Sequence, residues 1–401
     1  MTTINPKFPI RRRICIATST RADWGLLYPL AKALRQTDGV EVQILATNMH
    51  LMEEYGMTVR EIEEAGFEVS ARVRMRCEDE TARARVKAMA QCMEGCAEEL
   101  PRLQPDILVV LGDRYEMLAV ASTAAVLGIP IAHIAGGETS EGAIDDRLRH
   151  AITQLSTLHF TAAEPYRERV AQMLGTDKNV YNCGALGVWN IANQPLMSIE
   201  ELSQSLGFEL EAGKYFVATF HPATLDTGAT PAHRCQAMLD ALDRCPDYKV
   251  ILTYPNNDTG SEEIIQAINQ WAQSRPRVLL IKSLGMIRYL SAAKNAAAVI
   301  GNSSSGIVEV PSLGVPTIDI GIRQKGRLCG PSVLHCGDTS DDIANTIATA
   351  LSPQHQALSH LKQNPYHHPE TVTQITNHLL TFNSEYSKNH GLHGLHGYHP
   401  A

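Results

Sequence analysis

The first half of the sequence carries acidic residues of a kind that transfers protons in enzymes. Each follows a short apolar run, and in open parallel sheets ligands bind at the ends of such strands. Carboxylates that face one cleft raise one another's pKa values, which suits them to acid and base catalysis near neutral pH. These residues are Asp113, Glu116, Glu138, Asp145 and Asp146. We expect Asp113 to be functional, Glu116 to be a solvated residue in the first turn of a helix, and Asp23 to be a helix cap, while Asp145 and Asp146 also fit helix N-caps.

The sequence also carries residues suited to binding an anion such as a phosphate. Residues 301–306 (GNSSSG) lie between an apolar run and a helical pattern, where free backbone N–H groups and serine hydroxyls can surround phosphate oxygens. Arginines at other expected strand ends can add paired contacts. They are Arg21, Arg114, Arg323 and Arg327. The loop by itself fits a simple helix cap, but together with the arginines it favours phosphate binding. His221 fits a ligand contact and a buried, hydrogen-bonded imidazole equally well.

The elements that must position these residues follow a regular pattern, because short apolar runs alternate with helical stretches along the chain. Runs that are apolar throughout predict strands covered on both faces, and the alternation predicts parallel sheets with helical crossovers. The expected strands are residues 14–18, 42–47, 107–111, 129–134, 158–161, 180–183, 215–220, 250–253, 278–281, 298–300, 317–320 and 333–336. The expected helices include residues 26–34, 83–100, 117–127, 262–273 and 341–351.

The alternation runs twice along the chain, with an interruption near residues 184–197. We therefore expect two Rossmann-like, doubly wound α/β domains joined by a linker around residues 187–197. The N-terminal domain would span residues 1–187 and carry the carboxylates, and the C-terminal domain would span residues 188–370. A helix within residues 371–384 can pack on either domain, and residues 385–401 are expected to form a flexible, histidine-rich tail.

Composition narrows the classes of function. The 401 residues include 35 Lys and Arg against 43 Asp and Glu, and this excess of acid argues against general binding to nucleic acids or anionic membranes. No apolar run is long enough to cross a bilayer, the start lacks a signal-peptide pattern, and the cysteines do not suggest a disulfide framework, so we expect a cytoplasmic protein. No dinucleotide-binding or phosphate-loop motif is present. For Cys92 and Cys96, core packing is favoured over a metal site.

Seven segments carry a family resemblance when they are taken in order. They are residues 19–25 (STRADWG), 111–116 (LGDRYE), 133–138 (HIAGGE), 144–150 (IDDRLRH), 220–222 (FHP), 301–306 (GNSSSG) and 323–327 (RQKGR). The chain resembles the hydrolysing UDP-N-acetylglucosamine 2-epimerases, which feed sialic acid and related nonulosonic acids. The resemblance covers roughly residues 12–380. It implies a glycosyltransferase-B-like fold, in which two Rossmann-like domains bind UDP in the cleft between them.

The resemblance also implies a mechanism. A base removes the C2 proton of the sugar while UDP departs from C1, water then adds to the resulting glycal, and C2 is reprotonated with inverted configuration. Asp113 and Asp145 match catalytic carboxylates of the family, these acids would face a diphosphate held by the second domain, and no metal or nicotinamide is needed. The residues implied to hold UDP are Arg21, Arg114, His221, Asn256, Ser303, Ser304, Glu309 and Arg323. Among them, Ser303 and Ser304 would take phosphate oxygens, and Glu309 would accept hydrogen bonds from the ribose hydroxyls.

One position departs from the family pattern. Relatives that make N-acetylmannosamine often carry the sequence HIEGGE, and this chain has Ala135 in place of the first glutamate. Either Glu138 assumes part of that task, or Ala135 makes room for a bulkier sugar, and we favour UDP-N,N′-diacetylbacillosamine over UDP-N-acetylglucosamine. We also assign His50 to sugar binding and expect a homo-oligomer, either a dimer or a tetramer. The alternatives are a non-hydrolysing epimerase, a glycosyltransferase on the same scaffold, and a UDP-sugar binding protein without turnover.

Overall fold

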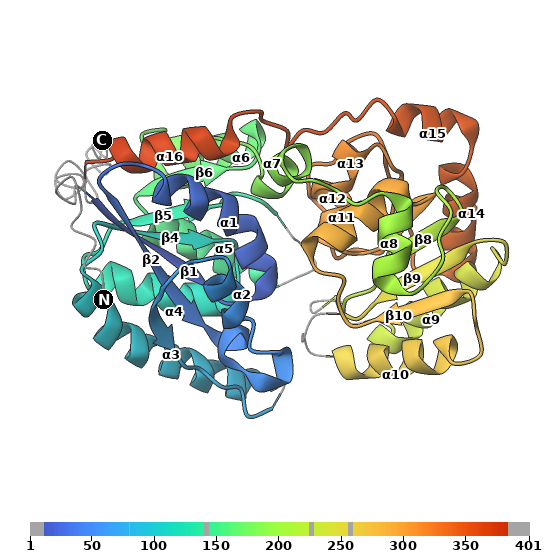
Figure 1. Cartoon of the computed structure of the whole chain (residues 1–401), viewed down its shortest axis with the longest axis horizontal. Helices are drawn as coiled ribbons and strands as arrows, with labels where there is room; N and C mark the ends of the chain where they lie inside the picture. Colours follow the sequence, from blue (N-terminus) through green and yellow to red (C-terminus); the bar gives the residue numbers. More distant parts are fainter. Residues whose placement is uncertain (1–11, 80, 140–143, 224–227, 256–259, 384–401) are drawn as a thin grey trace, which may run out of the picture. The chain divides into compact units, whose positions relative to one another are not determined.

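The computed structural model describes residues 12–79, 81–139, 144–223, 228–255 and 260–383. Its contacts divide the chain into two compact units (Figure 1). The first unit comprises Met1–Glu138, Arg147–Leu186 and His368–Ala401, and the second comprises Thr139–Asp146 and Gly187–His367. The change from one unit to the other after Leu186 falls within helix α7 (Leu186–Asn193), so much of the expected linker is helical. The expected histidine-rich tail lies outside the described residues.

The first unit is built on a seven-stranded sheet in the order β3-β2-β1-β4-β5-β6-β7, and all neighbouring strands in it are parallel. The strands are β1 (Arg12–Thr18), β2 (Val40–Thr47), β3 (Val69–Val73), β4 (Ile107–Leu111), β5 (Ile131–Ile134), β6 (Leu158–Thr161) and β7 (Val180–Asn182). The sequence predicts every one of them except β3. In β3 the polar residues Ser70 and Arg72 interrupt the apolar run by which the other strands are recognised.

Helices cover both faces of this sheet, and the C-terminal helix packs on this unit (Figure 1). The guanidinium of Arg12 donates hydrogen bonds to the carbonyl groups of Leu379 and Phe382, at the C-terminal end of α16. Cys92 and Cys96 are fully buried in the core beneath α3, which confirms their packing role. The helices are α1 (Arg21–Arg35), α2 (Val59–Glu64), α3 (Ala82–Leu103), α4 (Tyr115–Val126), α5 (Asp145–Leu155), α6 (Glu164–Leu174) and α16 (Thr371–Thr381), with short 3-10 turns at η1 (Asn48–Leu51) and η2 (Glu53–Tyr55).

The second unit is built on a six-stranded parallel sheet in the order β10-β9-β8-β11-β12-β13. Its strands are β8 (Tyr215–Thr219), β9 (Lys249–Thr253), β10 (Val278–Ile281), β11 (Ala298–Gly301), β12 (Thr317–Ile320) and β13 (Val333–Cys336), and the sequence predicts all six. Its further helices are α8 (Ile199–Leu206), α9 (Pro231–Asp243), α10 (Ser261–Ala272), α11 (Met286–Asn295), α12 (Ser304–Val308), α13 (Val310–Leu313), α14 (Ser340–Ala350) and α15 (Pro353–Ser359).

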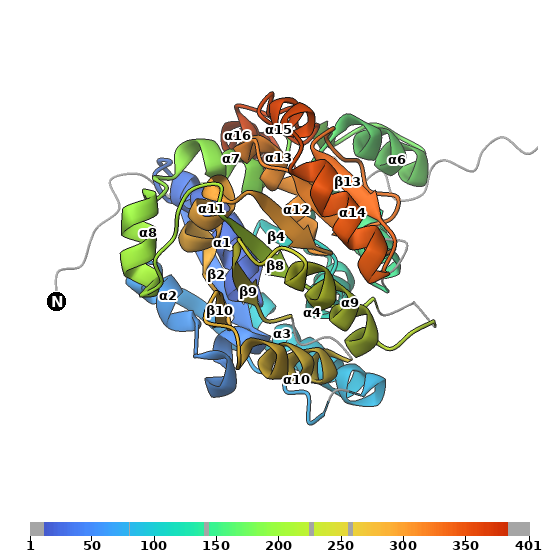
Figure 2. The same cartoon turned by 90° about the vertical axis from the view of Figure 1, so that its right-hand side faces the viewer.

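Alternate residues of the second sheet pack against different helices. Phe216 and Ala218 of β8 belong to one core with α9, α10 and α14, whereas Tyr215 and Val217 belong to another with α8 and α11 (Figure 2). A strand that buries both of its faces must be apolar throughout, which explains why these strands could be recognised in the sequence. The predicted fold class of two doubly wound parallel-sheet domains is therefore confirmed.

Each sheet reverses its strand order at one point, between β1 and β4 in the first unit and between β8 and β11 in the second. Ligands of doubly wound folds bind at the carboxyl ends of the strands near such a point. At the second point Gly301 ends β11 with a φ of 139°, and a Cβ there would overlap the Thr219 carbonyl group. Only glycine allows the two strand ends to lie so close. None of the described helices is long and apolar enough to cross a membrane.

Candidate active site

Asp113 lies directly after β4 and pairs with an arginine in the protein interior. Arg149 of α5 is 1% exposed, its Nη2 donates to Asp113 Oδ2, and its Nη1 donates to the Glu138 carbonyl oxygen at 2.8 Å. The side chain of Asp113 remains 23% exposed. A buried guanidinium requires an anionic partner and fixes its orientation. Asp113 is therefore a carboxylate held from the interior that solvent can still reach, and its catalytic role stays a prediction.

His133 of β5 fixes the loop that carries Asp113. Its Nε2 lies 2.8 Å from the Gly112 carbonyl oxygen and its Nδ1 lies 3.2 Å from Thr153 Oγ1. Burial lowers the pKa of His133 to about 4, so the ring is neutral near physiological pH. Since a carbonyl only accepts hydrogen bonds, the single ring proton is on Nε2. A Cβ at Gly136 would lie 3.0 Å from His133 Nδ1, so a side chain there would crowd the ring.

Glu116 is fully buried in the first turn of α4, so the expectation that it is solvated is wrong. Its Oε1 accepts from Arg114 Nε at 3.0 Å and Nη2 at 2.9 Å, and also from Asn48 Nδ2. The side chain of Arg114 is 26% exposed, so Glu116 anchors one edge of a guanidinium that still reaches solvent. Glu116 positions Arg114, and the UDP-binding role of Arg114 stays a prediction.

His50, assigned to sugar binding, is 0% exposed. Its Nε2 lies 3.0 Å from Thr18 Oγ1 and its Nδ1 lies 2.8 Å from Thr58 Oγ1. Burial lowers its pKa, which favours the neutral ring. In this structure His50 ties the segment after β2 to the carboxyl end of β1. A sugar contact stays a prediction, and it would require the ring to leave one of these hydroxyls.

The segment between β1 and α1 is organised by a capping box. Asp23 Oδ1 accepts from the backbone N–H of Thr20 at 2.7 Å, and Thr20 Oγ1 accepts from the backbone N–H of Asp23 at 3.3 Å, which confirms Asp23 as a cap. The cap sets the start of α1 at Arg21. The Nη1 atom of Arg21 lies 3.8 Å from Glu61 Oε1, and both side chains are largely exposed. Because the contact is long and solvated, it costs little to break when an anion approaches.

The segment after β5 begins with strained backbone. Ala135 has a φ of 65°, in the left-handed region that residues with a Cβ rarely adopt. Such positions cluster at functional sites, and Ala135 is the residue that departs from the family pattern. Glu138 is 6% exposed, and its carbonyl oxygen receives the hydrogen bond from Arg149 described above. Asp145 opens α5 one turn before Arg149, and residues at this spacing share a helix face.

In the second unit, Asn302 joins the ends of β8 and β11. Its Oδ1 accepts from the backbone N–H of His221 at 2.7 Å, and its Nδ2 donates to the His221 carbonyl oxygen at 2.8 Å. Its own carbonyl oxygen accepts from Arg323 Nη1 at 3.0 Å and Gln324 Nε2 at 2.9 Å. Asn302 is 2% exposed, so these bonds are shielded from water. One asparagine therefore fixes two residues predicted to hold UDP, His221 and Arg323.

The imidazole of His221 is neutral. Burial, and secondarily the charge of Arg323, lower its pKa well below the usual range. His221 can therefore offer a ligand one N–H donor or one ring-nitrogen acceptor, but no charge. Arg323 brings a positive charge to this strand end. At a phosphate group we would expect the arginine to make the charge-assisted hydrogen bonds and the histidine a neutral one.

Ser303 and Ser304 stand where β11 gives way to α12. Ser303 occupies the N-cap position of α12, and no hydrogen bond from its side chain caps the helix. Ser303 is therefore the N-cap residue by its backbone position, as a simple helix cap would require, but its hydroxyl does not cap the helix. Glu309 follows at the end of α12, and its carboxylate lies against Gly187, where a Cβ would be 3.0 Å from Glu309 Cδ. Glycine at 187 leaves the space that this carboxylate occupies.

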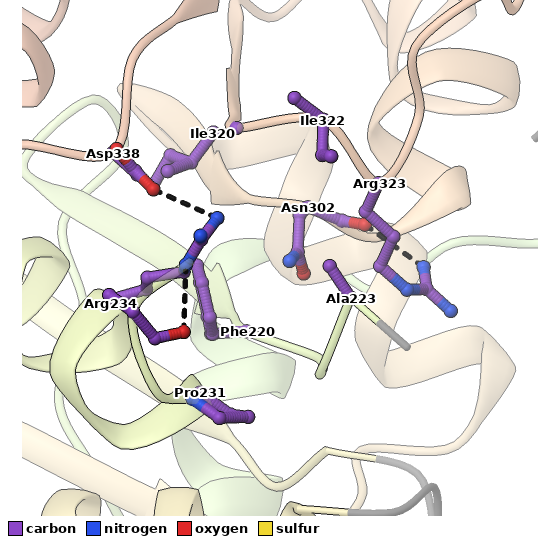
Figure 3. Close-up of a pocket in the computed structure, with 11 residues that line it drawn as sticks. Phe220, Ala223, Pro231, Arg234, Asn302, Ile320, Ile322, Arg323 and Asp338 are labelled. Carbon is purple, nitrogen blue, oxygen red and sulfur yellow. Dashed lines mark hydrogen bonds and ion pairs between the residues drawn. The ribbon is translucent and has the colours of Figure 1, made fainter. Parts of the chain in front are cut away.

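A small pocket opens beside Asn302 and Arg323 at the carboxyl edge of the second sheet (Figure 3). Figure 3 shows Arg234 of α9 pointing to Asp338, with Nη1 and Oδ2 2.9 Å apart, while Arg323 turns to the carbonyl group of Asn302. Phe220 and Ile320 contribute apolar lining to this pocket. The predicted UDP contact Asn256 lies outside the described residues. Within the described residues, no group of three or more His, Cys, Asp or Glu side chains is arranged to hold a metal ion.

Two residues that organise these strand ends, Arg149 and Asn302, were not among the predicted site residues. Both lie inside the segments that carry the family resemblance, so the signal was present in the sequence. What the sequence does not show is that their side chains point inward. Arg149 supports Asp113, and Asn302 supports His221 and Arg323.

Comparison with known proteins gives a consistent result. The family model described as UDP-N-acetylglucosamine 2-epimerase matches residues 32–380. A GDP/UDP-N,N′-diacetylbacillosamine 2-epimerase (hydrolyzing) from Campylobacter jejuni is 37% identical over 319 residues, which cover 79% of this chain and 82% of that protein. The polysialic acid biosynthesis protein P7 of Escherichia coli is 33% identical over 356 residues, 88% of this chain and 90% of that protein. The crystal structure of UDP-GlcNAc 2-epimerase from Neisseria meningitidis bound to UDP-GlcNAc superposes with a TM-score of 0.80 at 15% identity, over 92% of this chain and 100% of that one.

Proposed function

Because the chain belongs to the UDP-N-acetylglucosamine 2-epimerase family, we propose that it is a hydrolysing 2-epimerase of a UDP-2-acetamido sugar. The reaction converts the UDP-sugar and water into UDP and the free 2-acetamido sugar in the manno configuration. The observation that carries the proposal is Asp113, a carboxylate held by buried Arg149 and still reached by solvent at the end of β4. Loss of the C2 proton requires a fixed base of this kind.

The first step breaks two bonds of the substrate. A carboxylate of the group Asp113, Glu138 and Asp145 takes the proton from C2, and the C1–O bond to UDP breaks as the C1–C2 double bond forms. Negative charge then develops on the departing diphosphate, so cationic and hydroxyl groups placed there lower the barrier. Arg323 supplies the charge, and Ser303 and Ser304 supply hydroxyl donors.

The second step adds water to the glycal at C1 and returns a proton to C2 from the opposite face. A second carboxylate of the same group supplies this proton. Glu309 binds the ribose hydroxyls, and His221 contributes a neutral hydrogen bond to UDP. Arg21 and Arg114 contact the diphosphate, and Glu116 keeps the guanidinium of Arg114 in place.

The substrate we favour is UDP-N,N′-diacetylbacillosamine, with UDP-N-acetylglucosamine as the second candidate. Ala135 stands where relatives that make N-acetylmannosamine often carry a glutamate, and its smaller side chain would make room for the additional acetamido group of the first sugar. The name of the Campylobacter jejuni relative supports this choice. The free sugar would feed the synthesis of a nonulosonic acid of the legionaminic or sialic type, as the name of the Escherichia coli relative suggests.

The test is to incubate the protein with each UDP-sugar in deuterium oxide. We expect UDP and a free manno sugar that carries deuterium at C2, with the faster turnover from the diacetamido substrate. Absence of UDP from both substrates would contradict the proposal. A product that keeps UDP would indicate a non-hydrolysing epimerase, transfer of the sugar to an acceptor would indicate a glycosyltransferase, and tight binding of an unchanged ligand would indicate a binding protein.

A further inference from the structure

Three side chains of the second unit form a line of hydrogen-bonding groups that the proposed reaction does not use. Asp319 Oδ2 lies 2.8 Å from His335 Nδ1, and His335 Nε2 lies 3.5 Å from Cys329 Sγ. Asp319 and His335 are direct partners in the pairing of β12 with β13, so their side chains stand on one face of the sheet. Cys329 comes from the connection between these two strands. The order thiol, imidazole, carboxylate is that of an activated nucleophile with its base and an orienting group.

The carboxylate is the most buried group of this line, and the imidazole is the most exposed. The side chain of Asp319 is 2% exposed and that of His335 is 50% exposed, while Cys329 is half-buried. Asp319 Oδ1 has no hydrogen-bond partner among the described residues. A buried carboxylate is costly unless a cation is beside it. The hydrogen bond to Asp319, and secondarily the one to Cys329, raise the pKa of His335 to about 10, so the imidazole is a cation near neutral pH.

The backbone on both sides of Cys329 is anchored. The Leu328 carbonyl oxygen accepts from Tyr366 Oη at 2.6 Å, and Gly330 packs so closely on the carbonyl group of Gln363 that a Cβ would overlap it. The Gly330 carbonyl oxygen also accepts from the backbone N–H of Val333 at 3.1 Å. The sulfur is therefore held near the imidazole by the fold itself, and thiolates beside a cationic histidine are the reactive form of cysteine.

We propose that Cys329, His335 and Asp319 form a nucleophilic thiol site that reacts with small disulfides. The Cys329 thiolate attacks one sulfur of the disulfide, its S–S bond breaks, and a mixed disulfide forms on Cys329. The leaving thiolate takes the proton from His335 Nε2, so atoms and electrons balance without another reactant. Asp319 holds the imidazole in the orientation that faces the sulfur. The proposed epimerase reaction assigns no role to these three residues.

Two other cysteines serve as internal controls. Cys336 follows His335 on β13 and packs on the opposite face against the α9 and α14 core, and burial raises its pKa to about 12. Cys77 is half-buried like Cys329, and its Sγ lies 3.8 Å from Tyr115 Oη, a phenol rather than an imidazole. Accessibility alone would make Cys77 and Cys329 react alike, whereas the proposed site makes Cys329 faster.

The experiment treats the reduced full-length protein with glutathione disulfide and maps each modified cysteine by mass spectrometry. We expect Cys329 to react at least about tenfold faster than Cys77 and Cys336 near neutral pH. In His335→Gln the Cys329 rate should fall at least about tenfold near neutral pH. Asp319→Asn should lower the rate in the same direction.

A Cys329 rate equal to that of Cys77, or one unchanged in His335→Gln, would overturn the proposal. Unfolding of a variant would reveal itself, because the fully buried Cys15 would become reactive as well. In that case the test is the rate at which each cysteine of the wild-type protein reacts with iodoacetamide as a function of pH. Among the described residues, the titratable groups beside His335 are Asp319 from β12 and Cys329. Around neutral pH the Cys329 rate should exceed the Cys77 rate at least about tenfold, and equal rates would refute the site.

Discussion

Replacing Asp113 by asparagine separates the catalytic role of this carboxylate from its structural role. Removal of one partner of a buried ion pair costs about 3–5 kcal/mol, because the other charge stays buried. The side chain of Asp113 is 23% exposed and asparagine keeps an oxygen that can accept from Arg149, so we expect a smaller cost, about 2–3 kcal/mol. Domains have about 5–15 kcal/mol of stability, and the variant should therefore remain folded.

Turnover should fall much further than this loss of stability can explain. A general base contributes about 10²–10⁴-fold to the rate, whereas a loss of about 2–3 kcal/mol from a domain of ordinary stability unfolds at most a few per cent of the molecules. The assays are urea unfolding, UDP release under saturating UDP-sugar, and UDP affinity by calorimetry. We expect UDP affinity to be nearly unchanged, because Asp113 belongs to the proton-transfer group and not to the residues assigned to UDP.

Asp106→Asn is the matched control for this experiment. Asp106 precedes β4 at the end opposite to Asp113, and its Oδ2 accepts from the backbone N–H of Arg13 at 2.7 Å. It is a carboxylate that flanks the same strand and makes a structural hydrogen bond, so its loss should cost about 1 kcal/mol and leave turnover intact. If Asp113→Asn kept turnover within about tenfold of the wild type, or lost no more than Asp106→Asn does, Asp113 would not be the base.

Three further predictions concern the strand ends. Asn302→Ala leaves the backbone groups of His221 without their partners, so we expect about 2–3 kcal/mol of destabilisation by urea unfolding and a UDP affinity at least about tenfold weaker by calorimetry. Unchanged affinity would refute the positioning role. Gly301→Ala should fail to give soluble, folded protein in expression trials, because its Cβ would overlap the Thr219 carbonyl group; a folded variant would contradict this. The pKa of His133 is lowered to about 4 in the folded protein, below the unfolded value of 6.5. The contribution of His133 to the free energy of unfolding is therefore complete above pH 6.5 and is lost as the pH falls towards 4. The expected loss is about 3 kcal/mol, and urea titrations of His133→Gln should lack this part of the acid dependence.

The sheets were predictable from the sequence because burial on both faces leaves a signal in the strands themselves. Strands such as β4 and β8 are apolar along almost their whole length, and no partner has to be known to recognise them. β3 lies at the edge of its sheet and alternates buried with exposed residues, so that signal was lacking. Asp23 was predictable as a cap for a similar reason, because Thr20 and Asp23 satisfy each other within one helical turn.

The hydrogen bonds of the candidate site were harder to predict from the sequence than the sheets, because they depend on where polar side chains point. The sequence identifies Glu116 as an acid near a strand end, but its burial depends on Asn48 and Arg114, which come from another loop and from the end of β4. His50 presents the same difficulty, since its two partners Thr18 and Thr58 lie on either side of it in the chain. Residue types and strand ends follow from local patterns, whereas these pairings follow from tertiary packing.

In both units a buried, neutral side chain binds backbone groups of a loop at the end of a strand. A loop at the end of a parallel strand has backbone groups without partners in the sheet, and it stays in one conformation only if something binds them. In the first unit the neutral ring of His133 binds the Gly112 carbonyl oxygen, and in the second the amide of Asn302 binds both backbone groups of His221. Both supports are buried and uncharged, so they hold the loop without changing the charge presented to a ligand. The charge that each strand end presents to a ligand is then determined by the charged side chains beside these supports, such as Asp113 in the first unit and Arg323 in the second.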